Sequence, residues 1–106
     1  MTNQYKVVTY IEKNFANKYL QNIKTEKLNQ IGNYINCIST SEVVSCWTSL
    51  ENSNPTVGTP NTESVEREIK IELLVSVEDL ERVVSILRKY HPYETPEIDI
   101  YEIKQG

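Results

Sequence analysis

Residues 65–75 read VEREIKIELLV, and residues 76–90 follow directly as SVEDLERVVSILRKY. In the first stretch charged side chains alternate with aliphatic ones, which is typical of a β-strand with one solvent-facing side and one core-facing side. In the second stretch aliphatic residues recur every three or four positions, as they do in an amphipathic helix. The sequence therefore predicts a strand that leads directly into a helix.

Local signals mark both ends of this helix. Ser76 can accept a hydrogen bond from a free amide of the first turn, and Asp79 adds a carboxylate there. At the other end, Pro92 cannot continue a helix and pushes His91 towards an extended conformation. Residues 97–103, EIDIYEI, then alternate again and predict a closing strand.

The N-terminal half repeats the same order of elements. Residues 5–11, YKVVTYI, predict a buried strand, and residues 14–27 predict a helix with one apolar face. After Gly32 the composition favours strands at 34–39 and 43–50, which we interpret as a hairpin that turns at Ser41–Glu42.

Two strand–helix–strand halves predict one α+β domain over residues 1–106. The expected architecture is ferredoxin-like, βαββαβ, with an antiparallel sheet, two helices on one face and an extended middle hairpin. A chain of 106 residues is long enough to bury its own core. The sequence lacks the Gly-rich turn of a dinucleotide-binding fold.

Charge and hydropathy exclude several classes of protein. The formal net charge is −4, and the 11 basic residues are scattered among 15 acidic ones, which argues against binding of nucleic acid. Membrane insertion is not expected, because no run approaches the roughly 20 apolar residues that span a bilayer. The N-terminus has no signal-peptide pattern, so we expect a cytoplasmic protein.

The two cysteines are expected to be free thiols. Cys37 and Cys46 fit no zinc or redox spacing. A hairpin turning at 41–42 would nevertheless place them opposite each other, close enough to couple on oxidation.

Residues 52–62, NSNPTVGTPNT, predict a loop that is long for a small domain. Such a loop is either functional or simply loose.

Three motifs together resemble a known family. They are IGNY at residues 31–34 followed by Cys37, NPxxG at residues 54–58, and HPYExPxxDIY at residues 91–101. This ordered set resembles the YqfO-type domain, which is inserted in dinuclear-metal-centre proteins of the NGG1p-interacting-factor-like family. The resemblance covers residues 5–103 and implies a PII-like or CutA-like ferredoxin fold, trimer-like packing and no settled activity.

The sequence also departs from this family. Where the family has glycines, this chain has Val43-Val44-Ser45 and Lys27-Leu28-Asn29. Any ligand that reaches the main chain through those glycines elsewhere in the family is therefore in doubt here. The metal ions of the larger family members are held by flanking domains, which residues 1–106 do not include.

The HPYETPE stretch has three interpretations. The favoured one is a turn shaped for assembly, in which Tyr93 packs its ring beneath the sheet, Glu94 helps to cap free amides and Pro96 protects an edge strand. A metal site would need a trimer that brings three copies of His91 or of Glu94 to one axis. Acid–base catalysis by His91 and Glu94 lacks a partner nucleophile.

The favoured function is a small oligomeric binding or regulatory module, non-enzymatic, with a small molecule or a protein partner in clefts between subunits that the 52–62 loop lines. We predict no catalytic residue, and the only cofactor left open is a divalent metal held by His91 and Glu94. The candidate ligand-binding residues are Asn33, Tyr34, Asn54, His91, Tyr93 and Glu94.

Two other functions remain open. One is a metal-assisted enzyme whose site is shared between subunits and uses His91, Glu94, Asp99 and Tyr101. The other is a purely structural cap for a larger assembly.

For the assembly itself we expect a homotrimer in which the 34–50 ribbon pairs with a neighbouring sheet and buries Trp47. A two-fold dimer is the competing closed form, and Trp47 folded back on its own helices is the alternative within one chain.

Overall fold

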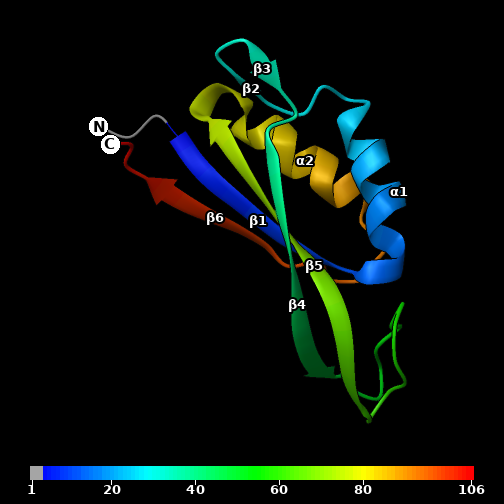
Figure 1. Ribbon diagram of the computed structural model, residues 1–106. Helices are drawn as coiled ribbons and strands as arrows, with labels where there is room; N and C mark the ends of the chain where they lie inside the picture. Colours follow the sequence, from blue (N-terminus) through cyan, green and yellow to red (C-terminus); the bar gives the residue numbers. More distant parts are fainter. Residues whose placement is uncertain (1–3) are drawn as a thin grey trace.

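The computed structural model describes residues 4–106, and its four long strands form one antiparallel sheet ordered β4-β5-β1-β6 (Figure 1). The elements are β1 (Gln4–Glu12), α1 (Lys13–Lys24), β2 (Gln30–Ile31), β3 (Tyr34–Ile35), β4 (Ile38–Thr48), β5 (Glu63–Ser76), the 3-10 turn η1 (Val77–Asp79), α2 (Leu80–Tyr90) and β6 (Ile98–Ile103). Strands β2 and β3 make a separate small hairpin. This order confirms the predicted ferredoxin-like α+β fold.

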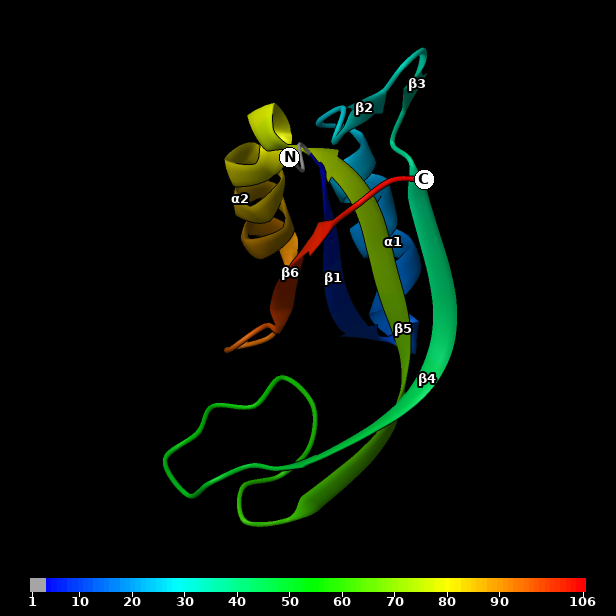
Figure 2. The ribbon, with the colours of Figure 1, turned by 90° about the vertical axis from the view of Figure 1, so that its left-hand side faces the viewer.

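Both helices cover the same face of the sheet (Figure 2). Strand alternation places one set of aliphatic side chains under the helices, because Val7 lies opposite Leu73 on one side and Ile100 on the other. The buried core consists of Val7, Ile11, Ile71, Leu73 and Val75 from the sheet and Ala16, Tyr19, Ile23, Leu28, Val83, Ile86 and Leu87 from the helical layer. The opposite face of the sheet carries no helix, and we call it the open face.

Strands β4 and β5 form a long arm that extends beyond the helices (Figure 1). They pair without interruption from Ile38 opposite Leu73 to Thr48 opposite Glu63. The connection between them, residues 49–62, curls back from the end of the arm towards the turn between α2 and β6 (Figure 2). The extended middle hairpin of the fold is therefore β4–β5.

The predicted hairpin within residues 34–50 is wrong, because residues 38–48 form one continuous strand. Ser41 and Glu42 lie in its middle, paired with Lys70 and Ile69, so the chain continues through the predicted turn without reversing. The opposition of Cys37 and Cys46 that such a hairpin would produce is therefore also ruled out. A strand rising about 3.3 Å per residue holds these free thiols roughly 25 to 30 Å apart.

Both helices are shorter than predicted. Helix α1 ends at Lys24 instead of residue 27, and Lys27 has a positive φ of 52°. Arg82 donates to the backbone carbonyls of Glu26, Lys27 and Leu28, so a side chain of α2 holds the chain after α1. At the start of α2, Ser76 donates to the Asp79 carboxylate at 3.3 Å and does not cap a backbone amide.

No helix within residues 4–106 combines the length and the apolar character that crossing a membrane requires.

Candidate functional site

A cleft of about 490 Å³ lies where the open face meets the β4–β5 loop and the turn after α2. We call it the aromatic cleft. Its lining comes from the open face (Tyr10, Ser45, Trp47, Glu68), from the end of β4 and the loop (Cys46, Thr48, Ser49, Leu50, Ser53, Pro55, Thr56, Val57) and from the turn (Tyr93, Glu94, Thr95, Glu97). Three segments that are distant in sequence therefore build one concave site.

His91 anchors the turn to the sheet. Its Nδ1 accepts from the Tyr93 amide at 3.2 Å, so the ring proton lies on Nε2, which donates to the Tyr10 carbonyl at 2.8 Å. The imidazole is buried and packs edge-on against the rings of Tyr19 and Tyr93, with centroids 5.2 Å and 4.7 Å away. Burial lowers the pKa of His91, although the Tyr10 carbonyl and the charge of Glu68 oppose that shift. His91 is therefore a neutral structural link.

Tyr93 forms one wall of the aromatic cleft. Its hydroxyl donates to Glu68 Oε2 at 2.6 Å, and its ring centroid lies 6.3 Å from that of Trp47, tilted by 48°. Burial, followed by the contact with Glu68, raises the pKa of Tyr93, so the phenol stays a protonated donor at neutral pH. The hydrogen bond fixes the Tyr93 ring beside Trp47, and the two rings give the cleft an apolar surface.

The loop is attached to the turn by two hydrogen bonds. The Asn54 amide donates to Glu94 Oε1 at 2.7 Å, and the Thr56 hydroxyl donates to the Pro92 carbonyl at 2.7 Å. Gly58 has a φ of +93°, and a Cβ at that position would overlap the Ser64 hydroxyl. These features explain why a proline- and glycine-rich loop takes one defined path over the open face.

The lining residues of the aromatic cleft include three glutamates and no lysine, arginine or histidine. Glu68 is 4% exposed and lies opposite Glu12 on the neighbouring strand. A hydrogen bond with the Asp99 carboxyl, and then burial, raise the pKa of Glu97. The cleft therefore offers carboxyl groups and aromatic rings to whatever enters it.

The structure brings together four of the six predicted ligand-binding residues. Tyr93 and Glu94 line the cleft, and the Asn54 amide in the loop donates to Glu94. His91 does not line the cleft but contacts Tyr93, which does. Asn33 and Tyr34 instead sit on the β2–β3 hairpin, at the opposite end of the molecule from the loop (Figure 1), where Tyr34 is 75% exposed. Their predicted role in binding stays a prediction.

Tyr10 and Glu68 line the cleft although neither residue was predicted to do so. Alternation places Glu66, Glu68 and Glu72 on one face of β5, but it does not indicate which of the three lines a cleft. Glu68 lines the cleft because of the path that the loop takes over the sheet, and this path is not visible in the strand pattern. Within its own chain Trp47 lies half-buried in the cleft beside Tyr93 and not against the helices, and its predicted place in a subunit interface stays a prediction.

His91 and Glu94 are not arranged as a pair of metal ligands within one chain. Both nitrogens of His91 are engaged, and Glu94 already accepts from Asn54. Across the part of the chain that the structure describes, no group of three or more His, Cys, Asp or Glu residues is placed to hold a metal ion. A site on a three-fold axis stays a prediction.

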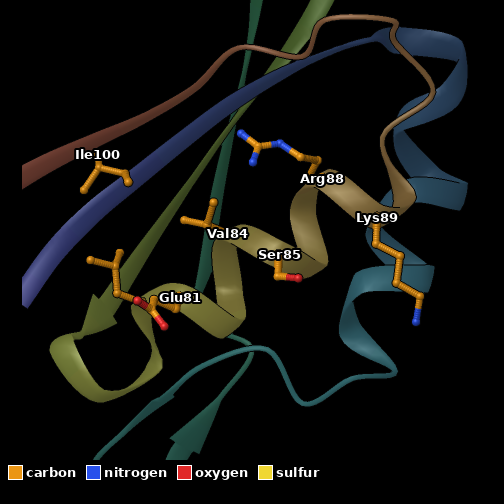
Figure 3. A pocket seen from close by; sticks show the side chains of 7 residues that line it. Glu81, Val84, Ser85, Arg88, Lys89 and Ile100 are labelled. Atoms are coloured by element: carbon orange, nitrogen blue, oxygen red, sulfur yellow. The ribbon is translucent and has the colours of Figure 1, made fainter.

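A second, shallower groove of about 520 Å³ runs between α2 and the edge strand β6 (Figure 3). Leu80, Val84 and Ile100 form its apolar part, and Ile100 is 49% exposed. Arg88 and Lys89 lie at one end (Figure 3). This groove adjoins a sheet edge, so it has the properties of a contact surface.

Comparison with curated proteins finds relatives over nearly the whole chain. It is 36% identical over 101 residues to a GTP cyclohydrolase 1 type 2 homolog of Staphylococcus aureus (strain COL), a match that covers 95% of this chain and 28% of that protein. The homolog from Halalkalibacterium halodurans is 28% identical over 99 residues, covering 93% and 27%. The chain thus spans little more than a quarter of the length of these relatives. No protein-family model matches it.

Solved structures show the same fold. A Bacillus cereus protein related to NIF3 superposes with a TM-score of 0.78 at 21% identity, over 98% of this chain and 26% of that one. CutA1 from Shewanella sp. SIB1 superposes with a TM-score of 0.69 at 18% identity, over 99% of this chain and 85% of that one. The predicted CutA-like fold is confirmed.

Proposed function

Because the chain belongs to the YqfO-type domains of NIF3-related proteins, we propose that it is a non-enzymatic, homo-oligomeric binding module whose ligand site is the aromatic cleft. The observation that carries the proposal is the closure of the cleft by the hydrogen bond from Asn54 to Glu94. A loop that was merely loose would not need a defined contact with a turn forty residues away.

The dimensions and lining of the cleft support a small ligand. Its volume of about 490 Å³ lies within the range of roughly 300–1,000 Å³ that is typical of small-molecule sites. Aromatic and aliphatic surface is combined with a few fixed polar groups, which is how such sites orient a ligand.

Catalysis has less support. Cys46 lines the cleft and could serve as a nucleophile only beside a general base. The one histidine, His91, is not available as that base, because both of its ring nitrogens form structural hydrogen bonds. The metal-assisted alternative would have to break these bonds. The name of the curated relatives refers to a whole protein of which this chain covers 28%, so it gives this domain no reaction of its own.

The two edges of the sheet support assembly into a ring. Strands β4 and β6 are the outer strands, and each has a neighbour on one side only within the described residues. Val44 on β4 is 70% exposed, and Ile100 on β6 borders the groove of Figure 3. Pairing β4 of one copy with β6 of the next satisfies both edges and covers both apolar side chains. A head-to-tail contact of this kind gives a ring when the rotation from one copy to the next closes, and we propose a closed ring of three copies.

A ligand screen tests the proposed binding site. Trp47 is the only tryptophan, so its emission reports on the cleft alone. A small-molecule ligand should change that emission and raise the melting temperature, and Tyr93→Ala should abolish both effects. Tyr101→Ala is the control, because Tyr101 is 55% exposed and does not line the cleft. A ligand that binds Tyr93→Ala unchanged would place the site elsewhere.

A further inference from the structure

Glu68 is a buried carboxylate without a countercharge. Its side chain is among the most buried acidic groups, at 4% exposed, yet it forms no ion pair within residues 4–106. Lys70 lies two positions away on the same face of β5 and does not pair with it. Because burying a charge is costly unless a partner compensates it, this carboxylate lacks the group that such a position normally has.

One oxygen of Glu68 is open to the aromatic cleft. Oε2 accepts from the Tyr93 hydroxyl, whereas Oε1 has no hydrogen-bond partner in the described chain. No side-chain oxygen there is both sealed and without a partner, so Oε1 must be accessible, and the cleft is the space that Glu68 lines. A ligand in the cleft can therefore reach it directly.

The surroundings of Glu68 make the site negative. Glu12 lies opposite it on β1, and Glu94 and Glu97 line the same cleft. None of the lining residues carries a positive charge. An anionic ligand such as a phosphate ester would meet repulsion without a compensating donor of opposite charge.

Aromatic rings complete a cation site. Trp47 and Tyr93 present their rings at an angle of 48°, and Tyr10 lines the cleft beside them. The faces of such rings attract organic cations, and most strongly where water is excluded. Carboxylate and ring faces together recognise a group that is both positively charged and partly apolar.

We infer that the aromatic cleft binds an organic cation, an alkylammonium group whose charge pairs with Glu68 and whose apolar substituents lie against Trp47 and Tyr93. This inference rests on the proposed function, since it assigns a ligand class to the same cleft. The ligand supplies the countercharge that the folded chain itself does not provide to Glu68.

The test uses probes of matched shape and different charge on the intact protein. Choline carries a quaternary ammonium, 3,3-dimethylbutan-1-ol is its neutral isostere, putrescine is a primary diamine and inorganic phosphate is an anion. Binding is followed by Trp47 emission and by NMR shifts of residues 45–48. We expect choline or putrescine to bind at least about tenfold more tightly than the neutral isostere, and phosphate not to bind.

Glu68→Gln removes the charge and keeps the size of the side chain. It should weaken binding of the ammonium probe about tenfold or more and leave the neutral isostere unaffected. Glu72→Gln is the matched control, because Glu72 shares the open face of β5 but does not line the cleft. Should Glu68→Gln not fold, Trp47→Leu replaces it, and it should weaken the ammonium probe more than the isostere. Because this variant has no tryptophan, its binding is followed by the NMR shifts alone.

The outcomes separate the ligand class from the binding site. Equal affinity for choline and its isostere, tighter binding of phosphate, or an unchanged ammonium affinity in Glu68→Gln would overturn the cation assignment and leave the proposed binding function intact. If neither these probes nor any compound in the wider screen perturbs Trp47, both proposals fail.

Discussion

The backbone amide of Asn54 donates to the carboxylate of Glu94 across 2.7 Å, although forty residues separate them. One lies in the proline- and glycine-rich loop and the other in the turn after the last helix. The contact makes the two segments a single structure that closes the aromatic cleft. Disturbing either residue should therefore affect the loop and the cleft together.

Glu94→Ala should free the loop without unfolding the domain. The lost hydrogen bond is exposed, so the global free energy of unfolding should fall by no more than about 1 kcal/mol. Locally, amide exchange at residues 53, 54, 56 and 57 should become roughly five- to tenfold faster. Glu51→Ala, in the same loop, should leave these rates unchanged. Equal exchange in wild type and Glu94→Ala would show that the contact does not order the loop.

Gly58→Ala should cost more stability than Gly32→Ala. Both glycines have positive φ, +93° and +58°, so each alanine pays backbone strain of about 1–2 kcal/mol. At Gly32 a Cβ meets open space, whereas at Gly58 it overlaps the hydroxyl of the buried Ser64. Urea unfolding should therefore rank Gly58→Ala as the less stable variant. The reverse order would mean that the loop adapts freely around residue 58.

The fold was predictable where burial is periodic. Residues 65–75 alternate cleanly because one face of β5 is in the core, and residues 80–90 repeat at helical spacing because one side of α2 is buried. Periodicity failed for β4, an edge strand on the arm, where neither face is fully buried. Without a buried face there, Ser41 and Glu42 resembled a turn.

The candidate site was predictable only in part. Proline, glycine and histidine mark the two segments that form its walls, because these residues constrain the backbone locally. Glu68 and Tyr10 have no such mark. Their role depends on where a loop folds in space, which is a tertiary property that single-strand patterns do not contain.

Acidification should destabilise the protein through His91. Burial lowers the pKa of His91 in the folded state below its ordinary value of about 6.5, so the unfolded chain binds the proton more readily. This contribution is fully present above about pH 6.5 and is lost as the pH falls from there towards the folded pKa. Urea unfolding at pH 7.5, 6.5 and 5.5 should show a decline that His91→Gln reduces.

The comparison of wild type with His91→Gln isolates the imidazole from the carboxyl groups. Glu97 has a raised pKa and therefore contributes to pH dependence with the opposite sign, but it is the same in both proteins. An identical pH slope in the two proteins between pH 7.5 and 5.5 would contradict the assignment of His91 as a buried neutral link.

Asn29→Ala should be among the most damaging single changes. The Asn29 side chain is 1% exposed, donates to the carbonyls of Cys37 and Leu74 and accepts from the Cys37 amide. Alanine leaves these half-buried partners without the hydrogen bonds that Asn29 makes, which costs roughly 2–3 kcal/mol. Gln30→Ala, next to it and exposed, should cost less than about 0.5 kcal/mol. Denaturant unfolding of both variants measures the difference.

The last prediction distinguishes a residue that is expected to stabilise the oligomer, Val44, from one that stabilises the single chain, Trp47. Val44 is 70% exposed on the edge strand, whereas Trp47 is half-buried against Tyr93 within its own chain. The two residues should therefore respond differently. Trp47→Ala should lower stability by about 2 kcal/mol or more through lost packing in the cleft.

Val44→Glu should instead dissociate the proposed ring while each chain stays folded. The new carboxylate faces Arg67 on the neighbouring strand, so a single chain tolerates it, but it places a charge where the β6 edge of the next copy would pack. Sedimentation at micromolar concentration should give a mass near three chains for the wild type and one chain for Val44→Glu. Val77→Glu, another exposed valine outside both edge strands, should sediment as the wild type does. A monomeric wild type, or a Val44→Glu variant that stays assembled, would remove β4 from the interface.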